Sequence, residues 1–118
     1  MNRIKEGYLI WMNISPHIPR SGRFTTGSRI ENKFLDLLEL SYTAYFTEKE
    51  KKADKLSDCI FIVDIIKFLI STAWEAKLIS HKQYGDIAVK LDEIGKMLWG
   101  WKRSLGLQKT APVRRGKK

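Results

Sequence analysis

The sequence predicts an all-α fold, an antiparallel up-down four-helix bundle, from three observations. No stretch alternates apolar and polar residues with the period of two that is typical of a half-buried strand. Apolar residues instead recur at helical spacing in four successive segments separated by short connections. The 118 residues are 43% hydrophobic and 30% charged, a composition that suits one compact domain. Together these features favour a single bundle with consecutive helices as antiparallel neighbours.

The first two helices lie on either side of a proline-containing bend. Apolar spacing predicts a helix over about residues 3–15, which ends before Pro16 because proline disfavours helical geometry in the residue preceding it. The segment 15–20 contains two prolines and predicts a rigid bend. A second helix is expected to begin between residues 21 and 25 and to run to about Thr47.

The third helix, over about residues 53–77, is apolar around most of its circumference. It follows the charged run 48–52, which predicts a solvated turn or a helix start. Ten of the twelve residues from Cys59 to Ile70 are apolar, interrupted only by Asp64 and Lys67. A helix of this kind needs cover on more than one side.

The fourth helix has the clearest pattern in the chain. Ser80 and Gln83 match a capping box at its start. Its apolar residues step by three and four through three heptads, at Tyr84, Ile87, Leu91, Ile94, Leu98, Trp101 and Leu105. The pattern ends after Gly106, and residues 107–118 carry five bases and no acid. We therefore expect a four-helix bundle over residues 1–106 and a disordered basic tail over residues 107–118.

The apolar surface of the third helix predicts assembly into a closed homo-oligomer. Residues two apart on a helix diverge by roughly 200 degrees. Phe61, Ile65, Phe68 and Trp99 therefore cannot all point inward together with the apolar residues beside them. Large exposed apolar patches mark interaction sites, so we expect contacts between copies of the chain. The alternative is that the first helix or the tail covers this surface within one chain.

The sequence holds no convergent set of catalytic or metal-binding residues, and it predicts neither an enzyme nor a cofactor. The only histidines, His17 and His81, are outside the Glu-x-x-His repeats that di-iron bundles use. Cys59 lies in the apolar run and is expected to be a buried structural thiol. The glycine-flanked segment 22–28 lacks the lysine and the preceding strand of a phosphate-binding loop.

Charge and cysteine content favour a cytoplasmic protein that binds a polyanion. The net charge is +9, and the seven bases in residues 102–118 leave the rest of the chain with 15 bases and 13 acids. One cysteine suits a reducing cytoplasm, and the longest apolar run, residues 59–63, is far shorter than the ~20 residues needed to span a bilayer. We therefore expect no membrane association.

Basic side chains are the candidates for contacts with nucleic acid or with a partner. Arg29 and Lys33 are four residues apart and share a helix face, although a solvated face is an equally good interpretation of this cluster. Lys67 interrupts an apolar run, so it either pairs with Asp64 one turn earlier or lies where a partner meets the surface. In a ring of copies such charges would add to a stronger field. The candidate residues are Arg20, Arg23, Arg29, Lys33, Lys67, Lys96, Lys102 and Arg103.

Three segments resemble a known family. They are Ile18-Pro19-Arg20, Arg23-Phe24-Thr25-Thr26-Gly27 and, above all, Leu91-Asp92-Glu93-Ile94-Gly95-Lys96-Met97-Leu98-Trp99-Gly100-Trp101-Lys102. Over roughly residues 8–105 the chain resembles the accessory variability determinant (Avd) proteins of diversity-generating retroelements. These belong to a wider group of four-helix bundles that includes proteins encoded in ribosomal RNA intervening sequences.

The resemblance implies a basic, barrel-like homopentamer that associates with a reverse transcriptase and its template RNA or cDNA and supports mutagenic cDNA synthesis. It implies no activity for the bundle itself, and it makes Lys67 and Pro19-Arg20 partner-binding positions. Trp99 stands where glycine is common in the family, whereas Gly95 and Gly100 agree with close helix approach. The alternative function is an interaction protein of the intervening-sequence type, with a protein partner or an unknown one.

Overall fold

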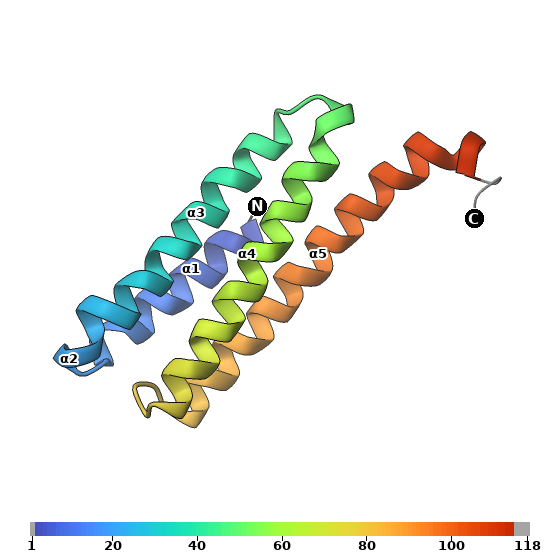
Figure 1. Ribbon diagram of the computed structural model, residues 1–118. Helices are drawn as coiled ribbons and strands as arrows, with labels where there is room; N and C mark the ends of the chain where they lie inside the picture. Colours follow the sequence, from blue (N-terminus) through green and yellow to red (C-terminus); the bar gives the residue numbers. More distant parts are fainter. Residues whose placement is uncertain (1, 115–118) are drawn as a thin grey trace.

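Four long helices pack side by side in the computed structural model, which describes residues 2–114, with side chains as far as Leu105 (Figure 1). The helices are α1 (Asn2–Ile14), α3 (Ser28–Tyr45), α4 (Lys49–Glu75) and α5 (His81–Arg114). Helices α1 and α4 each pack against both α3 and α5, so α3 and α5 lie on a diagonal of the bundle. The described residues contain no strand, and the predicted all-α class is confirmed.

The bend after α1 is built from three short helical pieces. Ser15–His17 forms a 3-10 turn with Pro16 in its first turn, and α2 (Arg20–Gly22) follows. A π-helical turn, η2 (Arg23–Gly27), then leads directly into α3, so the predicted second helix is one continuous run. The indole Nε1 of the buried Trp11 donates a hydrogen bond to the Gly27 carbonyl oxygen at 3.3 Å, which ties the π turn to α1.

Helix α4 begins at Lys49, so the charged run 48–52 is the start of a helix, one of the two predicted alternatives. The helix ends at Glu75, close to the predicted end, and Lys77 adopts a φ of 63°. The amide of Leu78 donates to the carbonyl oxygen of Ala73 at 2.9 Å, the bond that closes a helix end of the Schellman type. A Cβ added to Gly22 would meet a Leu78 methyl at 2.9 Å, so the bend packs closely on this connection.

The predicted capping box at the start of α5 is confirmed. The amide of Gln83 donates to Ser80 Oγ at 3.1 Å, and the amide of Ser80 donates to Gln83 Oε1 at 2.8 Å. The backbone of α5 continues past the predicted boundary at Gly106 to Arg114. A single glycine costs a helix only about 1 kcal/mol, too little to end a long one by itself. The remainder of the predicted tail, residues 115–118, lies outside the described residues.

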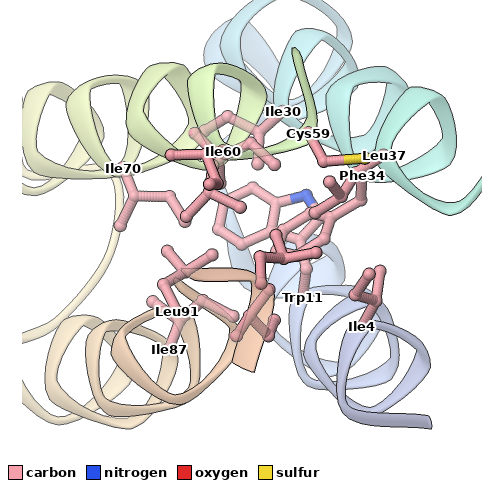
Figure 2. Close-up of a cluster of buried hydrophobic side chains, with 14 of the residues drawn as sticks. Ile4, Trp11, Ile30, Phe34, Leu37, Cys59, Ile60, Ile70, Ile87 and Leu91 are labelled. Carbon is pink, nitrogen blue, oxygen red and sulfur yellow. The ribbon is translucent and has the colours of Figure 1, made fainter. Parts of the chain in front are cut away.

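All four long helices contribute to one apolar core, in which Trp11 and Phe34 are the largest fully buried side chains (Figure 2). The predicted stripe of α5 is buried at Ile87, Leu91, Ile94, Leu98 and Leu105. Cys59 is buried as predicted, and burial raises the pKa of its thiol to about 11. The core therefore contains no thiolate near neutral pH.

Candidate assembly and nucleic-acid interface

The outward face of α4 exposes two phenylalanine rings. Phe61 is 63% exposed and Phe68 is 68% exposed, two helical turns apart, with the half-buried Ile65 between them. Helix α1 packs on α3 and α5 and leaves this face open. The prediction that some of these apolar side chains face outward is therefore confirmed, and among the described residues no segment covers Phe61 or Phe68.

A narrow groove of about 190 Å³ runs between α4 and α5, with Asp64, Lys67, Asp92 and Lys96 among its lining residues. Lys67 Nζ lies 3.1 Å from Asp92 Oδ1 across the groove. Of the two predicted alternatives for Lys67, pairing with Asp64 is therefore wrong, because the lysine side chain reaches across to α5 and not back along its own helix. Both members of the pair are partly exposed, so the ion pair stabilises the fold only weakly.

Trp99 lies at the outer edge of the same groove. Its ring is about half exposed, and Lys102 Nζ lies 5.1 Å from the ring centroid. The ring therefore finds room at the surface, where it lines the groove between α4 and α5. A Cβ added to Gly100 would have no neighbour within 4 Å, and one added to Gly95 would meet only the Lys67 ammonium, at 3.9 Å. The close helix approach expected at these glycines is absent from the described protomer.

The basic residues of the bend have unequal roles. Arg20 and Arg29 are exposed, and Lys33 is half-buried on α3. Arg23 donates from Nη2 to the carbonyl oxygens of Pro16 and Ile18, at 3.0 and 3.1 Å, and from Nε to that of Ile18 at 3.2 Å. Arg23 thus holds the backbone of the bend in place, a role that its spacing in the sequence did not indicate.

The structure does not gather the eight predicted bases into one patch on a protomer. Arg29 lines a hollow of about 560 Å³ with Phe24 and Leu69, on the side of α4 that faces α3. Lys67 and Lys96 share the groove between α4 and α5, and Lys102 and Arg103 follow on α5. The candidate bases thus form two groups, one on the bend and α3 and the other along the groove between α4 and α5 and the part of α5 that follows it.

An ion cluster joins α1 to α5, and sequence reasoning missed it. Lys90 Nζ lies 2.8 Å from Glu6 Oε1 and 3.0 Å from Glu93 Oε1, and its side chain is only 18% exposed. The hydrogen bond and charge of Lys90 lower the pKa of Glu6, and the same two carboxylates raise the pKa of Lys90. The i,i+3 spacing of Lys90 and Glu93 was visible in the sequence, but Glu6 is 84 positions away.

The two histidines of the chain line one hollow of about 710 Å³ beside the connection from α4 to α5. Trp74 lies between helices there: its Nε1 donates to His81 Nδ1 at 2.9 Å, and its ring stacks on Tyr84 with centroids 4.6 Å apart. His17 lines the same hollow from the bend. In the described part of the chain, neither this hollow nor any other place brings three potential metal ligands together.

Across the helices of residues 2–114, none has a stretch both long and apolar enough to span a bilayer.

A family model described as bAvd-like matches residues 4–105. No curated protein and no solved structure matches the chain. The family match spans the core-forming part of all four long helices.

Proposed function

The chain belongs to the bAvd-like family, and from this premise we propose that it is the non-enzymatic accessory protein of a diversity-generating retroelement. In this role it binds the reverse transcriptase and the template RNA or cDNA through a basic oligomeric surface and supports mutagenic cDNA synthesis. The observation that carries the proposal is the family match over residues 4–105, which accounts for the bundle as one unit.

Assembly into a barrel-like homopentamer is part of this proposal. Phe61 and Phe68 present adjacent apolar surface on α4, and Trp99 on α5 adds a half-exposed indole to the neighbouring groove. Burying such side chains against a second copy removes apolar area from water, at about 25 cal/mol for each Å². A ring of copies would also repeat Lys96, Lys102 and Arg103 around its axis and strengthen the positive field.

Phosphate neutralisation is the expected mode of nucleic-acid binding. The net charge of +9 and the bases on α5 suit counterion release, which depends on salt and little on base sequence. Titrating labelled RNA with the protein at several salt concentrations tests this. The logarithm of the affinity should fall linearly with the logarithm of the salt concentration, and RNAs of equal length should bind alike.

A charge-reversal pair gives the sharper form of this test. The double substitution Lys96→Glu, Arg103→Glu should weaken RNA binding and flatten the salt dependence. Lys82→Glu is the matched control, because Lys82 is an exposed base at the other end of the same helix. Because Lys82→Glu reverses one charge and the pair reverses two, a loss in the control of about half that of the pair, on a logarithmic scale of affinity, would point to net charge alone and not to this face.

Association with the reverse transcriptase has its own test. The protein should co-purify with the reverse transcriptase encoded in the same retroelement, and a reverse-transcriptase gene should lie beside its own gene. If the protein binds RNA weakly and without salt dependence, and captures no reverse transcriptase, these results would favour the alternative function, an interaction protein of the intervening-sequence type. The exposed rings of α4 are the feature that such a protein partner would use.

A further inference from the structure

Three aromatic side chains gather at the turn between α3 and α4. We call Tyr42, Tyr45 and Phe46 the turn cluster; they are 58%, 57% and 67% exposed. The Phe46 ring centroid lies 5.0 Å from that of Tyr42 and 5.0 Å from that of Tyr45, with interplanar angles of 61° and 85°. The rings therefore meet edge to face, which fixes them relative to one another and leaves much of their surface to solvent.

A lysine is fixed beside these rings. Lys52 Nζ lies 5.9 Å from the centroid of Tyr45 and 5.9 Å from that of Trp101 on α5. The same ammonium donates a hydrogen bond to the carbonyl oxygen of Tyr45 at 3.2 Å, at the C-terminal end of α3. That carbonyl and the helix dipole hold the cation in place. The turn cluster is thus an exposed aromatic surface with a positioned positive charge at its edge.

The surroundings of the turn cluster carry an excess of positive charge. Residues 48–55 and 101–105 together hold six bases and three acids. Among the three acids, Glu48 lies 3.8 Å from Lys51 and so has a counter-charge. Helix α5 projects beyond the turn at this end of the bundle (Figure 1). An excess of bases around an apolar surface favours a polyanion with an apolar component over an uncharged protein segment.

We propose that the turn cluster binds the unpaired bases of a single-stranded RNA by stacking. Exposed aromatic faces beside basic side chains are the combination that proteins use for single strands, because every base has a π-face and every nucleotide a phosphate. Base pairing hides those faces inside a duplex, so the turn cluster discriminates single strands from duplexes. The inference rests on the proposed nucleic-acid function and adds a base-contacting element to its phosphate contacts.

The test compares two RNAs of equal phosphate number, an unstructured oligouridylate and a blunt duplex, by fluorescence anisotropy with the full chain. The double substitution Tyr42→Ala, Phe46→Ala should weaken oligouridylate binding about tenfold, the loss expected for an unstacked base. Duplex binding and the salt dependence of both affinities should stay unchanged, because the phosphate contacts remain.

Two controls separate stacking from a general loss of apolar surface and from hydrogen bonding by the tyrosine hydroxyls. Phe24→Ala removes a phenylalanine that is 66% exposed and lies 6.0 Å from the Arg23 guanidinium, at the other end of the bundle, and it should leave both affinities unchanged. The double substitution Tyr42→Phe, Tyr45→Phe keeps the rings without their hydroxyls and should retain oligouridylate binding. Unchanged melting by circular dichroism would show that each variant folds.

Three results would overturn the inference. The first is that Tyr42→Ala with Phe46→Ala lowers the affinity for duplex and for single strand equally. The second is that Tyr42→Phe with Tyr45→Phe lowers the affinity for oligouridylate. The third is that the alanine pair loses reverse-transcriptase capture without losing RNA affinity. Each would leave the proposed function standing, because the parent protein would still bind RNA or the polymerase. If the parent protein bound no RNA at any salt concentration, the nucleic-acid part of the proposed function would fail first.

Discussion

At the scale of single residues, Arg23 stabilises the fold by holding the backbone of the bend in place. Its guanidinium donates three hydrogen bonds to the carbonyl oxygens of Pro16 and Ile18, partly shielded from solvent. Arg23→Met would leave both carbonyls without this donor, and we expect the free energy of unfolding to fall by about 1–3 kcal/mol in urea titrations. RNA affinity should change little.

The matched control for Arg23 is Arg29→Met, which removes an exposed base from the same basic segment. It should leave stability within about 0.5 kcal/mol of the parent, as surface substitutions usually do. A stable Arg23→Met protein with weakened RNA binding would contradict our interpretation and return Arg23 to the phosphate-binding group.

The cluster of Glu6, Lys90 and Glu93 predicts how stability changes with pH. Lys90 lowers the pKa of Glu6 below its ordinary value of 4.5, so this contribution is present above pH 4.5 and is lost as the pH falls through the lowered pKa. The carboxylates raise the pKa of Lys90 above 10.5, so its contribution is present below pH 10.5 and is lost as the pH rises through the raised pKa.

In thermal melts, Glu6→Gln should therefore unfold at a lower temperature than the parent protein near neutral pH. This difference in melting temperature should shrink toward about pH 3. Glu39→Gln is the control, since Glu39 is exposed and forms no ion pair in the described part of the chain. A deficit of constant size at every pH would mean that Glu6 acts through packing and not through charge.

At the scale of helices, apolar spacing and capping chemistry predicted most of the fold. The stripe and capping box of α5 depend on residues close in sequence, and both are present in the structure. The end of α4 at Glu75 could be placed only approximately, because a lysine, Lys77, and not a glycine takes the left-handed conformation after it. The π turn had no local signal, since the contact that ties it down comes from Trp11 in another helix.

The candidate site was predicted less completely, for a related reason. Lys67 was recognised as unusual, but its partner Asp92 lies on another helix, and sequence spacing can only suggest neighbours on the same one. The eight bases were predicted as one set. In the structure they fall into two groups, because α3 and α5, which carry most of them, lie on a diagonal of the bundle. The turn cluster was missed because aromatic residues at helical spacing are more often core than surface.

Gly100 gives a prediction for helix α5. Among the described residues, no atom outside its own stretch of helix lies within 4 Å of a Cβ added there, so the glycine only weakens the helix. Gly100→Ala should raise the free energy of unfolding of the single chain by about 0.5–1 kcal/mol, measured at concentrations low enough to separate copies. Lower stability of the separated chain would contradict the open environment of Gly100. A smaller particle at high concentration would instead indicate that another copy approaches the helix at this glycine.

At the scale of the whole molecule, the proposed assembly rests on the exposed rings of α4, Phe61 and Phe68. The parent protein should scatter light as a multiple of its 13.7 kDa chain mass. Phe61→Glu with Phe68→Glu places two carboxylates in the expected contact, and burying them without partners is costly. We therefore expect a particle of single-chain mass that remains helical by circular dichroism.

The control for this pair is Phe24→Glu, which charges an equally exposed ring outside the α4 face. It should assemble like the parent protein. Unchanged mass in the Phe61 and Phe68 variant would move the contact to another face, and a parent protein of single-chain mass would remove the assembly proposal altogether.

The burial of Cys59 has a practical consequence for studying the proposed assembly of copies. It is the only cysteine of the chain, and burial keeps its thiol protonated at neutral pH. The thiolate is the nucleophile that adds to a maleimide, so a cysteine introduced on the surface would react far faster than Cys59 in the otherwise native protein. Each copy would then carry one fluorophore at a chosen position, and energy transfer between copies would report their spacing and number directly.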